Sequence, residues 1–318
     1  MINFYVSVII PVYNAEKTLG RAINSVLLHN EITELVLVED GSVDNSYALC
    51  LHEQKRDNRI IVLQHQGGQN KGVSASRNLG IKNCKNEFIA FLDADDYYLP
   101  NRFEQTIKSF ITNPEADGIY EMTGLINEDG VISSYSQIGL VNAENLFENL
   151  QPLGEKVWFH CNGLTVKKTI FEKCGFFEEK IKTSEDTLQW FKMALTAKLL
   201  PGNIDRPVVL AVKTFGSLSS DKVRVNKDFV TMLCKLFGFC KYANCTKERK
   251  ELVLAKLFFF WLQSSFNFQD KATQLLSVFT ADPSFVLFRS KSFRLHAGNF
   301  IGVNRLRFFV SRNRKNSF

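Results

Sequence analysis

Short apolar runs alternate with amphipathic segments through the first hundred residues of the chain. Residues 6–12 form a β-branched run, and apolar side chains then recur at helical spacing over residues 19–27. Further apolar runs at 35–38, 60–63 and 88–92 repeat this pattern, and each of them ends in a polar loop. The alternation predicts an α/β fold with a mostly parallel sheet flanked by helices.

The pattern becomes less regular in the second hundred residues. It predicts strands near 118–126 and 162–166 and a helix over about 184–198. After a Gly/Ser-rich stretch the sequence becomes rich in phenylalanine and then in basic residues. We therefore expect one domain over residues 1–215 and a helical, Phe-rich and basic region over 216–318.

The length and composition suit a globular protein whose basic charge is concentrated at one end. The chain has 318 residues, of which 45% are hydrophobic, and a net charge of +6. Residues 283–318 hold eight Lys and Arg and no acidic residue, so the remainder carries 31 basic and 33 acidic residues, or −2. Interleaved Phe and Arg in this tail suit peripheral contact with an anionic membrane. A solvated tail or one packed on the domain is the alternative, and we expect no nucleic-acid partner.

Nothing in the sequence indicates export or a membrane span. The seven cysteines include no C-x-x-C pair, which is typical of reduced thiols in a cytosolic protein. The first residues lack the basic region of a signal peptide. The longest apolar run, 252–262, has eleven residues and contains Lys256, whereas a spanning helix needs about 20 apolar residues. We therefore expect a cytoplasmic protein, alternatively one that is peripheral on the inner membrane face.

Three loops at the ends of the predicted strands carry candidate chemistry. Asp93, Asp95 and Asp96 follow a buried strand, and crowded carboxylates favour a divalent cation such as Mg²⁺ or Mn²⁺. An acidic turn before a helix is the alternative. The loop at 39–46 adds Asp40, which helix capping does not explain. The third loop, 70–78, places two cations at the start of a predicted helix. This arrangement is typical of a diphosphate-binding site, and the alternative is a helix start whose cations are simply exposed to solvent.

Spacing excludes several other nucleotide and hydrolase motifs. Gly67 and Gly72 have the interval of a P-loop, but Val73 stands where the lysine is required. No G-x-G-x-x-G follows the first strand, and no H-E-x-x-H or G-x-S-x-G occurs. These absences argue against P-loop nucleotide hydrolysis, a dinucleotide cofactor, a zinc protease and a serine hydrolase.

Four ordered segments resemble the inverting glycosyltransferases of family 2, which have the GT-A fold: VSVIIPVYNAEKTL, LVLVEDGSVDNS, NKGVSASRNLG and FIAFLDADD. The resemblance covers about residues 5–215. It implies that Pro11 and Tyr13 border the nucleotide base and that Asp40 hydrogen-bonds a uracil. It also implies that Lys71 and Arg77 lie near the nucleotide and its phosphates.

The same resemblance assigns the acidic loop to the ribose and a metal. It implies that Asp93, with the adjacent Ala94, meets the ribose side of the nucleotide. Asp95 would coordinate Mn²⁺ or Mg²⁺ that bridges the diphosphate of the donor. Glu39 departs from the usual pattern, since Asp is common there, and we expect this change of one methylene to be tolerated.

A later segment resembles the acceptor-side half of these enzymes. It begins near Asn162 and ends at Glu185 and Asp186. The resemblance implies that Asp186 is the catalytic base and that Glu185 supports it or touches the donor sugar. Two acids in the first turn of a helix are also favoured by the helix dipole, which is the structural alternative. Residues 187–191 lack the arginine that is often found there.

Together these features predict an inverting, metal-dependent glycosyltransferase of the hexosyltransferase type. We expect it to move a sugar from a nucleotide-sugar donor, a UDP-sugar, to a hydroxyl of a glycan or lipid-linked saccharide in bacterial lipopolysaccharide or capsule synthesis. One alternative is a sugar nucleotidyltransferase, which requires a glycine-rich N-terminal signature that is missing here. A non-catalytic binding protein with the same fold is the other alternative.

Overall fold

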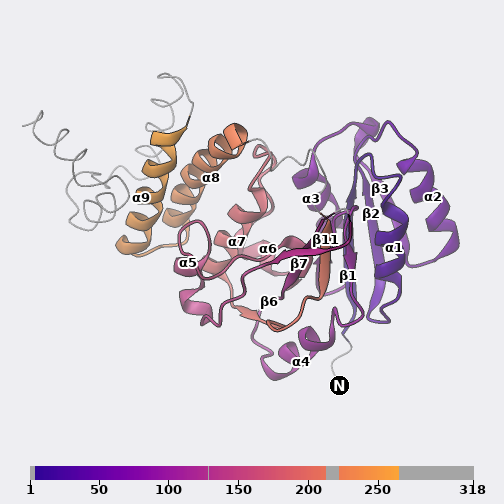
Figure 1. The fold of residues 1–318 in the computed structure, drawn as a ribbon, viewed down its shortest axis with the longest axis horizontal. Coiled ribbons are helices and arrows are strands. Elements are labelled where there is room, and N and C mark those ends of the chain that lie inside the picture. The colour runs from indigo at the N-terminus through magenta and orange to yellow at the C-terminus, as the bar shows by residue number, and fades with distance from the viewer. Residues whose placement is uncertain (1–3, 128, 213–221, 265–318) are drawn as a thin grey trace, which may run out of the picture. The chain divides into compact units, whose positions relative to one another are not determined.

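The computed structural model describes residues 4–127, 129–212 and 222–264 (Figure 1). The chain divides into two compact units, Met1–Ser217 and Leu218–Phe318. None of the described helices has both the length and the apolar character needed to cross a membrane. The basic tail, for which membrane contact was predicted, lies outside the described residues.

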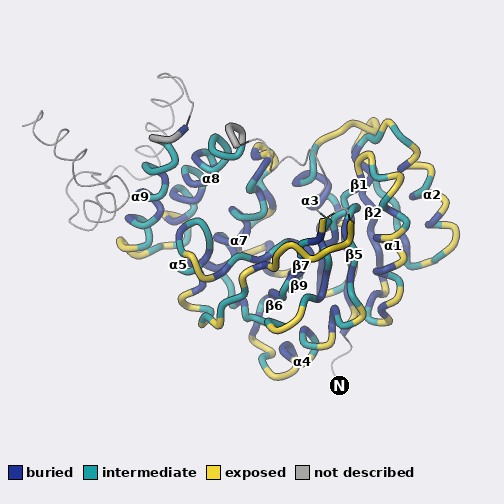
Figure 2. The backbone as a smooth tube through the Cα atoms, viewed as in Figure 1, coloured by how far each residue is buried: buried dark blue, intermediate teal, exposed yellow. Residues whose placement is uncertain are grey.

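A seven-stranded sheet forms the centre of the first unit. Its strands, in spatial order, are β10 (Leu199–Pro201), β6 (Gly118–Tyr120), β9 (Leu164–Lys167), β4 (Phe88–Phe91), β1 (Val6–Val12), β2 (Ile32–Glu39) and β3 (Ile60–Gln64). All neighbours are parallel except β9, which is antiparallel to both β4 and β6. The predicted α/β class with a mostly parallel sheet is confirmed, and strands β1 and β2 at its centre are mostly buried (Figure 2).

Helices cover both faces of this sheet. The α-helices described in this unit are α1 (Leu19–Leu27), α2 (Ser46–Arg56), α3 (Val73–Asn83), α4 (Glu104–Thr112), α5 (Leu146–Asn149), α6 (Ile170–Cys174) and α7 (Glu185–Thr196). Helices α1 and α2 lie on one side of β1–β3, and α3 lies on the other (Figure 1). Helix α3 approaches β1 closely, because a Cβ on Gly80 would lie 2.5 Å from Cγ2 of Ile9. Alternate side chains of β1 therefore pack on opposite layers.

A second sheet of four strands stands beside the carboxyl ends of the first. It has the order β5 (Tyr97–Tyr98), β11 (Val209–Val212), β7 (Thr123–Ile126) and β8 (Ile132–Tyr135). The strand pattern predicted near 118–126 corresponds to β6 and β7, which belong to different sheets. The chain passes from one sheet to the other between Tyr120 and Thr123. Glu121 lies in this connection, and its buried carboxylate accepts a hydrogen bond from Arg102.

The described part of the second unit is a pair of packed helices, α8 (Lys222–Tyr242) and α9 (Lys247–Gln263). Thr246 caps α9 by accepting a hydrogen bond from the main-chain N–H of Arg249, at 3.3 Å. The rings of Phe229 and Phe260 stack with centroids 5.1 Å apart. The described part of the Phe-rich region therefore forms two helices with aromatic contacts such as this one between them.

Candidate active site

The loops after β1 and β2 are joined by hydrogen bonds at the carboxyl edge of the sheet. The main-chain N–H of Asn14 donates to Oγ of Ser42 at 3.1 Å, and Val43 N–H donates to Oδ1 of Asn14 at 2.9 Å. Ala15 N–H donates to Oγ of Ser46 at 2.7 Å. Asn14 itself is left-handed, with φ of 49°, a conformation that asparagine tolerates. The two loops therefore form one rigid rim.

Two residues predicted to border a nucleotide base lie on this rim. Pro11 is half-buried within β1, opposite Val38 of β2. Tyr13 follows the strand, and 51% of its surface is exposed, which leaves its ring available to stack on a ligand. Their contact with a base stays a prediction.

Asp40 connects the rim to the start of α3. Its buried carboxylate accepts hydrogen bonds from the main-chain N–H groups of Lys71, at 2.7 Å, and Gly72, at 2.9 Å. His65 Nε2 lies 3.4 Å from the same carboxylate. The side chain of Lys71 remains exposed. Asp40 thus orders the loop 65–72, and its predicted bond to a uracil stays a prediction.

We expect Gly41→Ala to destabilise the first unit by about 1–3 kcal/mol, because two penalties act together. Gly41 has φ of +72°, and a Cβ there would lie 2.7 Å from both Asn70 N and Gly68 O. Chemical unfolding measures the loss. Gly130→Ala is the matched control, since Gly130 has φ of +77° with nothing within 4 Å of the added Cβ. Equal losses of unfolding free energy in the two variants would show that the close approach of Gly41 to the loop 65–72 does not contribute to the effect.

Arg77 joins the two halves of the site. Its buried guanidinium donates to Asp93 Oδ1 at 2.8 Å and to Glu185 Oε1 at 3.0 Å. Burial acts to raise the pKa of Asp93, but the charges of Arg77 and His160 outweigh it and hold that pKa below its ordinary value. Arg77 therefore holds two carboxylates in place, that of Asp93 after β4 and that of Glu185 at the start of α7.

Helix α3 makes further bonds on either side of Arg77. Ser76 Oγ lies 3.0 Å from Nε2 of His65. Asn78 donates to the main-chain oxygen of Phe177 at 3.0 Å and to Glu179 Oε1 at 2.9 Å, and its own oxygen accepts from Phe177 N at 2.9 Å. Asn78 had no role in the sequence prediction, although it stands within the motif that carries Arg77. Helix α3 thus anchors both halves of the site.

The acidic loop after β4 is crowded as predicted. The Asp95 carbonyl accepts a hydrogen bond from Arg21, at 2.6 Å. Burial, followed by the charge of Asp93, raises the pKa of Asp95. Asp96 is buried and accepts from Val212 N at 2.8 Å and from the side-chain amide of Asn162. Burial and the charges of Asp93 and Asp95 raise the pKa of Asp96 well above its ordinary value.

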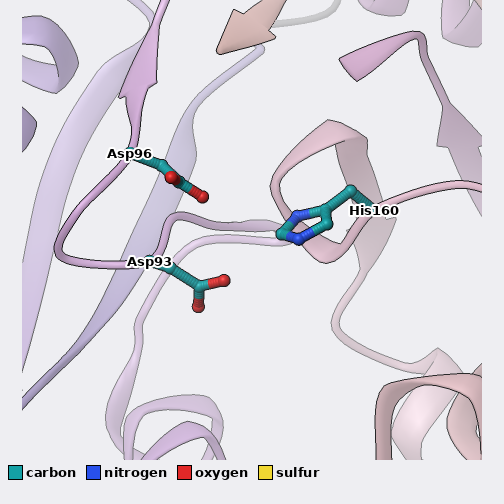
Figure 3. A group of neighbouring side chains, drawn as sticks. All are labelled: Asp93, Asp96 and His160. Atoms are coloured by element: carbon teal, nitrogen blue, oxygen red, sulfur yellow. The ribbon is translucent and has the colours of Figure 1, made fainter. Parts of the chain in front are cut away.

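Among the described residues, Asp93, Asp96 and His160 form a group that could hold a metal. One ligand atom from each lies within 4.8 Å of the others, and their side chains point toward one another (Figure 3). Two carboxylate oxygens and an imidazole nitrogen are a donor set that suits Mn²⁺. The sequence prediction placed the metal on Asp95, which this group does not include, and it missed His160. Ligation by Asp95 stays a prediction.

The acids at the start of α7 differ in their environments. They follow Ser184, which is left-handed with φ of 69°. The half-buried carboxylate of Asp186 accepts hydrogen bonds from N and Oγ1 of Thr187, at 2.6 and 3.2 Å. Glu185 is buried, and burial followed by the charge of Asp186 raises its pKa to about 7, although Arg77 opposes the shift. The structural alternative, helix capping, therefore explains part of the role of Asp186 and little of Glu185.

We expect stability to fall between about pH 4.5 and 7, and Glu185→Gln to flatten that decline. The folded protein holds a proton on Glu185 up to its pKa of about 7, whereas the unfolded chain releases it near 4.5. One such proton corresponds to a slope of about 1.4 kcal/mol per pH unit. Thermal unfolding across this window measures it. Glu172→Gln, at an exposed position, serves as control, and an unchanged slope in Glu185→Gln would contradict the raised pKa.

Comparison with known proteins places these features in context. The model for "Glycosyl transferase family 2" matches residues 7–175. An uncharacterised glycosyltransferase of Rickettsia felis is 29% identical over 244 residues, which are 74% of this chain and 39% of that protein. The Escherichia coli protein WfgD, named as a UDP-Glc:α-D-GlcNAc-diphosphoundecaprenol β-1,3-glucosyltransferase, is 31% identical over 150 residues, 47% of this chain and 57% of WfgD. The chain thus spans about 40 to 60% of the length of these two relatives.

A solved structure shares the fold. The crystal structure of residues 1–349 of Staphylococcus aureus TarS in complex with UDP-GlcNAc superposes with a TM-score of 0.63. The match covers 87% of this chain and 80% of the TarS fragment, at 21% sequence identity. At this level of identity the likeness describes the fold.

Proposed function

Because the chain belongs to glycosyltransferase family 2 and has the GT-A fold, we propose that it transfers a sugar from a UDP-sugar to a hydroxyl of a glycan or lipid-linked saccharide. The observation that carries this proposal is Arg77, which brings Asp93 and Glu185 into a single site beside Asp186. The named activity of WfgD, with a UDP-sugar donor and a diphosphoundecaprenol acceptor, supports the substrate classes. Synthesis of a bacterial surface polysaccharide such as lipopolysaccharide or capsule is the corresponding process.

The nucleotide would bind along the rim formed after β1 and β2. Tyr13 offers an exposed ring for the base, and Asp40 keeps lone pairs beyond its two main-chain bonds. Lys71, exposed at the start of α3, offers a cation for the diphosphate. Arg77 is already paired with the carboxylates of Asp93 and Glu185. Its effect on phosphate binding would therefore be indirect, through the positions of these two side chains.

The acidic loop would hold Mn²⁺ or Mg²⁺. Asp93, Asp95 and Asp96 crowd three carboxylates into one loop, and His160 faces two of them. A bound divalent ion would neutralise charge that develops on the departing nucleoside diphosphate. Asp96 is fixed by Val212 and Asn162, so its carboxylate is oriented before any ion arrives.

Asp186 would remove the proton from the acceptor hydroxyl. Its carboxylate is half-buried at the first turn of α7, and its two bonds to Thr187 leave further lone pairs free. Glu185 would position the donor-binding part of the site through its ion pair with Arg77. A single in-line displacement, with the acceptor oxygen replacing the diphosphate, would invert the anomeric carbon, and an α-linked donor would give a β-linked product.

Release of nucleoside diphosphate from a panel of UDP-, dTDP- and GDP-sugars tests this function. The purified protein is incubated with each donor in Mn²⁺, in Mg²⁺ or in EDTA, without acceptor. We expect slow, metal-dependent hydrolysis of one UDP-sugar. UDP binding without turnover, even with extracted lipid-linked saccharides, would favour the non-catalytic alternative. No nucleotide binding at all would overturn the proposal.

A further inference from the structure

We propose that His160 is a ligand of the divalent cation in this site and that its nitrogen gives the site a preference for Mn²⁺ over Mg²⁺. This inference rests on the proposed function and adds to it a residue from outside the acidic loop. The imidazole belongs to the segment before β9, whereas Asp93 and Asp96 follow β4. Ligand atoms of the three side chains lie within 4.8 Å of one another (Figure 3).

Asn162 holds His160 in place against the acidic loop. The side-chain oxygen of Asn162 accepts from the main-chain N–H of Asp93 at 3.0 Å, and its amide donates to the carboxylate of Asp96. Asn162 is fully buried, and it lies in the short 3₁₀ turn Cys161–Gly163, whose N-cap residue is His160. These two bonds tie the 3₁₀ turn that follows His160 to both aspartates, so the imidazole is held near the acidic loop before a metal binds.

Capping of this turn does not account for the imidazole. His160 is the N-cap of the 3₁₀ turn, but its Nδ1 lies 3.5 Å from the N–H of Asn162, at the long limit for a hydrogen bond. A Ser or Asp side chain is the usual group for such a cap. The ring instead faces two carboxylates of the acidic loop (Figure 3), where a cation would satisfy all three side chains.

The chemistry of the donor atoms determines the expected selectivity. Mg²⁺ favours oxygen ligands in near-ideal octahedral geometry and retains several waters. Imidazole nitrogen suits transition ions, and Mn²⁺ accepts both nitrogen and carboxylate oxygen. Removing the nitrogen from the site should therefore weaken Mn²⁺ binding more than Mg²⁺ binding.

Metal binding to the purified 318-residue protein tests the assignment without reference to turnover. Mn²⁺ and Mg²⁺ affinities are measured by calorimetry, with and without UDP, for wild type, His160→Gln and His160→Ala. We expect both variants to lose at least about tenfold in Mn²⁺ affinity, with a smaller loss for Mg²⁺. Pulsed EPR of the Mn²⁺-loaded protein should show modulation from a coordinated nitrogen, and this signal should disappear in both variants. His52→Gln, at an exposed site on α2, is the matched control and should behave as wild type.

The outcomes separate this inference from the proposed function. Mn²⁺ binding with no nitrogen signal, or with affinity unchanged in His160→Gln, would overturn the role of His160 while leaving the glycosyltransferase proposal intact. Equal losses of Mn²⁺ and Mg²⁺ affinity would overturn the selectivity. Wild-type protein that binds neither UDP nor metal would overturn both proposals. Circular dichroism of each variant establishes that the affinities compare folded proteins.

Discussion

Asp186→Asn is expected to lower the rate of sugar transfer by about 10²- to 10⁴-fold, the usual contribution of a general base. An amide cannot take the proton of the acceptor hydroxyl, so the oxygen would attack without activation. The change is nearly isosteric, and the asparagine oxygen can still accept the two hydrogen bonds from Thr187. Initial rates with a reactive donor and acceptor, together with UDP affinity by calorimetry, measure the effect.

The control must separate loss of the base from loss of structure. Asp205→Asn makes the same chemical change on an exposed loop before β11 and should leave the rate unchanged. Retained UDP affinity in Asp186→Asn would locate the defect in the chemical step. Transfer at the wild-type rate would remove Asp186 from the role of base. Loss of nucleotide binding along with transfer would instead assign it a structural role at the start of α7.

The arrangement of the strands was predictable because hydrophobic runs determine it locally. The run at 6–12 coincides with β1, and the carboxyl ends of parallel strands must meet at one edge of the sheet. That rule predicts from the sequence alone that Asp40 and the acidic loop lie in one region. The tolerance expected for Glu39 also has a basis in the structure, since its longer carboxylate accepts from Ser42 N and from Gln64.

The residues that complete the site were not predictable, because their contacts join distant segments. Asn162 bonds to residues 66 and 69 positions earlier, and Glu185 bonds to Arg77 across 108 positions. His160 precedes a short irregular turn, where no periodicity indicates which way a side chain points. The helix-start pattern at 70–78 suggested that Arg77 faces phosphate, whereas in the structure two carboxylates already pair with it. Tertiary pairing of this kind leaves no local signal in a single sequence.

A buried ion pair outside the site ties the segment between β5 and α4 to β9 and to the connection between β6 and β7. Arg102 is fully buried and donates to Glu121 Oε2, to the carbonyl of Leu164 and to Oγ1 of Thr165, each at 3.1 Å. Glu121 also accepts from Thr106 Oγ1, at 2.6 Å, where the chain passes from β6 to β7. Burial raises the pKa of Glu121, and the charge of Arg102 opposes that shift. Arg102 is the largest of the contributions that favour the ionised carboxylate, and the hydrogen bonds from Thr106 and Asn203 add to it.

Arg102→Met is expected to destabilise the first unit by about 3–5 kcal/mol, because it leaves Glu121 buried without its cation. Urea unfolding measures the free energy, and hydrogen exchange at β6 and β9 locates the opening. Arg206→Met, which breaks an exposed pair with Glu104, is the matched control and should cost about 0–1 kcal/mol. The double variant Arg102→Met/Glu121→Met should recover much of the loss, since it removes the stranded carboxylate together with its partner. A single variant as stable as the control, or a double variant less stable than the single one, would show that packing of the arginine chain matters here and the charge pair does not.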